Sequence, residues 1–204
     1  MGKMWRKAKE DQAMRAPRVW RKIVWGLCLC LSSTLTLPHT SDAATAQAIN
    51  TAADKALIDF KSKVKGADAF LRAASGYLMF PEVVQAGIGI GGQYGEGVLR
   101  IRGRSVAYYS IASGSIGFQL GAQRKSILIV FLQKGALDSF RAKAVAGKSW
   151  NVGVDGSVAL FNSGAQASID SATLNKPIVG FVFGQSGLMY NLSLEGSKIT
   201  KLQR

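Results

Sequence analysis

The sequence predicts an α+β protein, a mostly antiparallel β sandwich or barrel-like sheet with one long N-terminal amphipathic helix and one short helix. An apolar stripe with helical spacing runs through residues 45–75, and from residue 77 the apolar residues follow a period of two. The 23 glycines against 4 prolines suit strands with tight turns and close backbone approach. At 48% hydrophobic and 19% charged residues, the 204-residue chain is too apolar to be disordered.

Residues 1–43 are predicted to be a secretory signal peptide, and residues 44–204 the folded domain. A basic start precedes an apolar run at 23–37, and Ser41 and Ala43 place small residues at a cleavage site. The run has about 15 residues, fewer than the roughly 20 that a bilayer-spanning helix needs. An uncleaved anchor and a buried core helix remain the alternatives, and the start codon, Met1 or Met14, stays open.

The signal peptide predicts an exported protein, periplasmic or associated with the cell envelope. Cleavage would remove both cysteines, Cys28 and Cys30, together with the single histidine, His39. Neither cysteine follows a small residue, so we expect no acylation. The remaining 18 Lys and Arg against 9 Asp and Glu give a net charge of +9. Without thiol or imidazole, the chain lacks the usual zinc ligands and cannot build a Ser-His-Asp or Cys-His site.

Carboxylates are the acid–base groups that remain, and two of them lie in turns. Asp155 is followed by Gly156 and Glu195 by Gly196, and turn geometry alone favours these pairs. We therefore predict no catalytic residue, no metal and no cofactor, and we expect the protein not to be an enzyme. A buried pair of carboxylates in a cleft would instead favour a glycoside hydrolase.

The helix predicted over residues 45–75 carries a continuous apolar stripe. Its residues recur at steps of three and four: Ile49, Ala53, Leu57, Phe60, Val64, Ala67, Leu71 and Ala74. Such a stripe is typical of a helix packed on a sheet. A basic side and two phenylalanines also suit a helix that lies on a membrane surface, so both interpretations remain.

Residues 77–203 are predicted to be the β-rich body. The run Ser126–Leu132 is continuously apolar, which is typical of a central strand buried on both faces. A short helix is expected over Gly135–Ala146. Ile178–Phe183 and Leu188–Leu194 are expected to pair as a hairpin across the glycines that separate them.

Two local signals concern the first strands of this body. Pro81 is predicted to end a short strand that begins at Tyr77. Residues 87–92 match G-x-G-x-x-G by letter, but no helical pattern follows, and nucleotide binding needs a helix at that point. We interpret these glycines as sites of close backbone approach or of β-bulges.

Basic residues are the strongest functional signal. Arg100 and Arg102 share one face of a predicted strand, and the other candidates are Arg104 just past the turn and Lys61, Lys63 and Lys65 on the helix. The positive charge favours anionic partners, although a solvated basic surface is the alternative. Nucleic acid is not expected, because the aromatic residues are not interleaved with basic ones and export removes access.

Four long motifs resemble the SYLF domain family, and together they extend over nearly the whole chain after residue 43. They are residues 80–100, 108–123, 150–158 and 183–199. The resemblance implies phosphoinositide and membrane binding, and the actin regulation known for yeast members. With its predicted signal peptide the chain resembles the exported bacterial branch, so actin is not an expected partner.

Together these features predict an exported, non-enzymatic module that binds anionic phospholipid headgroups through basic residues and an amphipathic helix. The alternative is a structural or protein-interaction module of the cell envelope with an envelope protein as its partner.

Overall fold

The computed structural model describes residues 44–162, 175–187 and 194–204. The chain divides into two compact units, Met1–Asp42 and Ala43–Arg204, and all of the described residues belong to the second unit. The predicted signal peptide lies outside the described residues and stays a prediction. None of the helices that the structure describes is long and apolar enough to cross a membrane.

Two long strands, β1 (Gly76–Ile101) and β2 (Arg104–Phe131), form an antiparallel ribbon that organises the fold. They are joined by a turn at Arg102 and Gly103, whose φ angles of 52° and 76° lie in the left-handed region. Glycine adopts that region at little cost, so Gly103 suits the second turn position. The turn predicted just before Arg104 is confirmed.

The remaining strands extend the sheet from the other edge of β2. β6 (Lys198–Leu202) pairs with the first part of β2, and β5 (Ile178–Gly187) pairs with its last part, both antiparallel. β3 (Trp150–Asn151) adds to β6, and β4 (Ala159–Asn162) runs parallel to β5. The sheet order is therefore β3-β6-β2-β5-β4, with β1 on β2, and the mostly antiparallel α+β prediction is confirmed.

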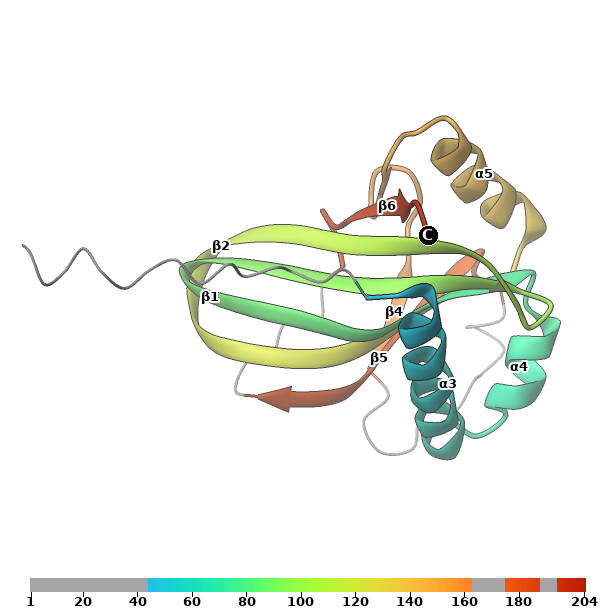
Figure 1. The fold of residues 1–204 in the computed structure, drawn as a ribbon, viewed down its shortest axis with the longest axis horizontal. Helices are drawn as coiled ribbons and strands as arrows, with labels where there is room; N and C mark the ends of the chain where they lie inside the picture. The colour runs from blue at the N-terminus through green and yellow to red at the C-terminus, as the bar shows by residue number, and fades with distance from the viewer. Residues whose placement is uncertain (1–43, 163–174, 188–193) are drawn as a thin grey trace, which may run out of the picture. The chain divides into compact units, whose positions relative to one another are not determined.

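The ribbon folds back on itself near the glycines of β1. A side chain at Gly95 would come within 2.6 Å of the Glu82 carbonyl oxygen, and one at Gly97 within 2.6 Å of the Phe80 ring. The two halves of β1 thus lie against each other, and the register shifts between Ile88 and Ile90 at the bend. Figure 1 shows both strands turning at the left of the view, away from the helices. Among the glycines of residues 87–92, a side chain at Gly87 would come within 2.4 Å of the Gly91 Cα, so the interpretation as a site of close approach is confirmed at Gly87.

The helix predicted over residues 45–75 is two helices, so its predicted length is wrong. α3 (Ala46–Lys63) begins at the N-cap Thr45, whose side chain accepts a hydrogen bond from the Ala48 amide. It ends at Val64, which is extended, and α4 (Ala67–Ala73) begins after Gly66 at a left-handed φ of 83°. Gly66 interrupts the helix because glycine adopts this conformation far more readily than other residues.

The apolar stripe of α3 packs on one face of the sheet. Phe60 contacts the rings of Phe181 and Phe183, with centroids 5.0 and 5.4 Å apart. Leu128 and Val130 of β2 belong to the same buried cluster. The interpretation of a helix packed on a sheet is therefore confirmed.

The opposite face of the sheet is covered by α5 (Lys134–Val145), which confirms the predicted short helix. Its Phe140 lies 5.0 Å from the rings of Tyr109 and Phe131 and 5.6 Å from that of Trp150. Residues 127–131 of β2 alternate between the two clusters and have no exposed surface. The predicted central strand, buried on both faces, is confirmed.

Two strand boundaries differ from the prediction. Pro81 does not end a strand, because β1 continues past it with a register shift between Phe80 and Val83. The regular hydrogen bonding between β1 and β2 is interrupted at Pro81. It is partly replaced, because the Ser126 hydroxyl donates to the Pro81 carbonyl oxygen at 2.7 Å. β5 continues through the predicted hairpin turn to Gly187, so that turn is wrong; the predicted strand Leu188–Leu194 begins outside the described residues.

Candidate anion-binding surface

The six predicted binding residues lie in two groups along α3. The first group lies near its N-terminal half and consists of Arg100, Arg102 and Arg104. There the Ser105 hydroxyl donates to the Asn50 carboxamide oxygen at 2.7 Å. The three lysines lie at its other end. Lys63 follows Asn50 by 13 positions, which at about 1.5 Å per residue separates the two groups by roughly 20 Å. The structure does not gather the six into one patch.

Arg100 has a structural role. Its side chain is only 10% exposed, and its Nη1 lies 2.6 Å from Oδ1 of Asp54 on α3. Its Nη2 also donates to the Asn50 carbonyl oxygen at 3.5 Å. Burial disfavours the charge of the guanidinium, but the hydrogen bond and charge of Asp54 outweigh burial and raise the pKa of Arg100. This residue ties the helix to the sheet.

The lysines at the end of α3 remain accessible although two of them are paired. Lys61 lies 2.8 Å from Asp68, and Lys63 lies 2.8 Å from Asp59. Exposed pairs of this kind contribute little free energy, so a stronger anionic ligand can replace the carboxylates. Lys65 is exposed and forms no ion pair with any carboxylate in the described ranges.

Arg102 and Arg104 flank the turn of the ribbon and project into solvent. Both are exposed, and neither forms an ion pair with a described carboxylate. The left-handed backbone at Arg102 places it in the turn itself, so the predicted shared strand face with Arg100 is lost. These two arginines are therefore available to an external anion.

The pairing of charges was not visible in the sequence. The described residues form seven ion pairs, which engage Asp54, Asp59, Asp68, Glu82, Glu96, Asp138 and Asp155. The exposed cations with no described ion pair are Lys55, Lys65, Arg72, Arg102, Arg104, Arg141, Lys148, Lys176, Lys198 and Lys201. Sequence reasoning missed most of them, because they do not cluster in the sequence.

The C-terminal part of the chain can be assigned to a family. Residues 112–204 match the family described as Ysc84, Las17-binding protein actin regulator. Over these residues, which are less than half of the chain, the protein is similar to the Ysc84, or SYLF, family. No curated protein matches the chain. The match contains the last part of β2, α5 and the strands β3 to β6, and it confirms the resemblance from residue 112 onward; the motif at 80–100 lies outside it. SYLF domains are a binding-domain family, so a non-enzymatic binding module fits this chain.

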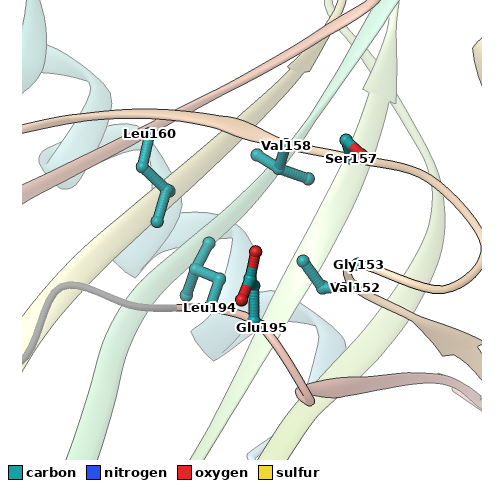
Figure 2. Close-up of a pocket in the computed structure, with 7 residues that line it drawn as sticks. All are labelled: Val152, Gly153, Ser157, Val158, Leu160, Leu194 and Glu195. Atoms are coloured by element: carbon teal, nitrogen blue, oxygen red, sulfur yellow. The ribbon is translucent and has the colours of Figure 1, made fainter.

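The matched region also carries a small pocket of about 130 Å³. The residues that line it are Val152, Gly153, Ser157, Val158, Leu160, Leu194 and Glu195. Figure 2 shows the Glu195 carboxylate pointing toward the space below Val158. Glu195 is the single ionisable group among these lining residues, which do not supply the two carboxylates that glycoside hydrolysis uses.

Asp155, the other carboxylate predicted in a turn, has its partners within the same matched region. It accepts hydrogen bonds from Lys143 and from the backbone and side-chain nitrogens of Asn151, the latter at 2.7 and 3.2 Å. The hydrogen bond from Lys143, followed by that from the Asn151 amide, lowers the pKa of Asp155. Within the described residues, no group of three or more His, Cys, Asp or Glu side chains could hold a metal ion.

Proposed function

We propose that this protein binds anionic phospholipid headgroups through exposed cations around α3 and the β1–β2 turn. The observation that carries the proposal is the unequal pairing of charges. Seven described carboxylates already have cationic partners, and a large set of exposed lysines and arginines has none. Each such side chain near an anionic membrane contributes about 1 kcal/mol, so several together give useful affinity.

Helix α3 contributes mainly charge to this surface. Its apolar stripe is buried against the sheet, while Lys55, Lys61 and Lys63 are exposed. Binding of this kind needs no rearrangement of the helix. It is coulombic and therefore sensitive to salt, because the Debye length falls from about 10 Å at 0.1 M salt to about 3 Å at 1 M.

The proposal includes location. The signal peptide predicted over residues 1–43 would place the protein in the periplasm or at the cell envelope, where phospholipid headgroups are the abundant anions. The same export would separate the protein from cytoplasmic actin.

Flotation of the complete chain with vesicles tests the proposal. We expect it to float with vesicles that contain phosphatidylglycerol and to dissociate as salt rises from about 0.1 to about 1 M. Vesicles made of phosphatidylcholine alone should bind less of the protein. No flotation with anionic vesicles, or flotation that ignores both headgroup and salt, would contradict the proposal.

Charge-removal variants locate the surface. Substituting Lys61, Lys63 and Lys65 together by Gln, or Arg102 and Arg104 together by Gln, should weaken binding about fivefold for each charge that touches lipid. The matched control is the double variant Lys148→Gln/Lys176→Gln, which removes two exposed cations from elsewhere in the sequence. Equal losses for each charge removed in all three variants would mean that net charge, and not this surface, attracts the lipid.

A protein-interaction module is the second candidate. The family description names a protein partner, Las17, for the family that residues 112–204 match. Cross-linking in intact cells separates the candidates. A co-purified envelope protein, without vesicle flotation, would favour this second function.

A further inference from the structure

The bend of the β1–β2 ribbon has an unusual surface. We define the tip as residues 83–95 of β1 and 112–123 of β2, which pair with each other around the bend. On β1, Ile88 is 80% exposed and Ile90 is 74% exposed, and both rank among the exposed large hydrophobic residues. Val84 and Tyr94, on the same two arms of the bend, are also exposed.

Past the buried Val83, the described inward side chains of the tip are polar. Gln85, Gln93 and Gln123 are buried there, with Lys125 beside them. The Lys125 ammonium donates to Gln85 Oε1 at 3.1 Å, and the Gln93 carboxamide donates to the Ser197 hydroxyl at 3.1 Å. Apolar side chains outside and polar side chains inside are the reverse of the usual arrangement in water.

Charged residues flank the tip in the sequence but do not occur within it. Neither arm of the tip contains a charged residue. Glu82 and Arg124 follow at one side, and Glu96, bonded to Arg204 at 2.7 Å, follows at the other. The Tyr94 hydroxyl donates to Glu96 Oε1 at 2.9 Å, so this ring lies between the apolar surface and the charges. Figure 1 shows this end of the ribbon at the left, apart from α4 and α5.

We infer that the tip enters the outer part of a lipid bilayer, with Ile88 and Ile90 among the acyl chains. Tyrosine favours the membrane–water interface, which is the level that Tyr94 would take, and the flanking charges would stay among the headgroups. The uncharged arms avoid the cost of placing charge in hydrocarbon. Pairing of β1 with β2 satisfies backbone groups along one edge of each arm, with a gap at the register shift between Ile88 and Ile90.

This inference shares its partner, a lipid bilayer, with the proposed function, but the contact is apolar rather than coulombic. The turn at Gly103 lies 13 residues along β1 from Ile90, which at about 3.4 Å per residue is roughly 44 Å of strand. The tip is therefore a contact separate from Arg102 and Arg104. Salt should weaken the cationic contact and leave the tip contact in place.

The double variant Ile88→Ser/Ile90→Ser tests the tip in the complete chain. Its matched control is Val145→Ser/Val154→Ser, because those valines are 81% and 84% exposed and lie outside the tip. At about 1 M salt we expect the tip variant to lose affinity for vesicles about tenfold or more, and the control to bind as the parent does. Residues 23–37 are present in all three chains and cancel in the comparison.

Two outcomes would overturn the inference. One is a tip variant that binds vesicles at high salt as tightly as the parent and the control. The other is a parent that forms dimers by size exclusion while the tip variant is monomeric with unchanged vesicle binding, which would make the tip a contact between copies. Failure of the proposed function is distinguishable, since it would remove the dependence on anionic headgroups at low salt in every variant, the tip variant included.

Discussion

The two ends of the β1–β2 ribbon are built from the same strands but pack in opposite ways. At the base, which we define as residues 76–80, 97–101 and 127–131, helices α3 and α4 lie on one face of the sheet and α5 on the other. Apolar side chains there are buried on both faces. At the tip, polar side chains are buried and Ile88 and Ile90 are exposed.

The difference shows that the covering helices decide whether an apolar side chain is buried. The alternation of side chains along a strand does not decide this by itself. Residues 127–131 stabilise the fold because both faces are covered. Ile88 and Ile90 have the same chemistry without a covering helix, so in water they contribute exposed apolar surface instead of stability. We therefore assign stability to the base and propose lipid contact for the tip and the exposed cations.

The largest expected effect comes from exchanging polarity between the two ends. Ile127→Gln places an unpaired carboxamide in the base and should lower the free energy of unfolding by about 3–5 kcal/mol. Gln123→Leu should change it by less than about 1 kcal/mol, because Oε1 of Gln123 has no hydrogen-bond partner among the described residues. Urea denaturation measures both. Equal losses in the free energy of unfolding would mean that the interior of the tip tolerates a change of polarity as poorly as the base does.

Glycine substitutions compare close approach at the base with open space near the bend. Gly97→Ala places a methyl group against the Met79 carbonyl oxygen and the Phe80 ring, and should destabilise by about 2–3 kcal/mol. Gly114→Ala meets no atom within 4 Å and should change stability by less than about 0.5 kcal/mol. Thermal unfolding monitored by circular dichroism measures the stability change in both variants. A tolerated Gly97→Ala would contradict the close contact between the two halves of β1.

Charge pairs separate structural from accessible cations. Asp54→Ala leaves the buried Arg100 without its carboxylate and should destabilise by about 1–2 kcal/mol, a value limited by the exposure of Asp54. Asp59→Ala breaks the exposed pair with Lys63 and should change stability by less than about 0.5 kcal/mol. Urea denaturation of both variants checks the difference. Equal small losses of stability in the two variants would mean that Arg100 is an accessible cation rather than a structural one.

The smallest expected effect is the pH dependence from Asp155. Its pKa is lowered in the folded state, so its contribution is fully present above the ordinary value of 3.8 and is lost as pH falls through the lower folded value. Asp155→Asn should therefore lower Tm at neutral pH and flatten the decline of Tm in acid below about pH 4. Parallel Tm profiles for the parent and the variant would show that the bond with Lys143 does not contribute to stability.

Much of the fold could be predicted from short-range patterns. Helix α5 and the buried run at 127–131 were predicted because each has a clear local pattern. The break of the long helix at Gly66 was missed because the apolar stripe continues across it into Ala67 and Leu71. Pro81 misled the prediction because the Ser126 hydroxyl, distant in sequence, supports the strand there.

The candidate site could be predicted only in part. Lys65, Arg102 and Arg104 are accessible cations, as the sequence suggested. The partner of Arg100 is Asp54, which lies 46 positions earlier, and no local pattern reveals that pair. The tip was also not predicted, because a period of two gives two faces without saying which of them a helix covers.

Hydrogen exchange of the complete chain, with and without phosphatidylglycerol vesicles, tests the division between tip and base most directly. We predict that lipid slows amide exchange in residues 83–95 and around Lys61–Lys65, while residues 127–131 exchange equally slowly in both states. Unchanged exchange in residues 83–95, with slowing confined to residues 23–37 or absent throughout, would contradict the account.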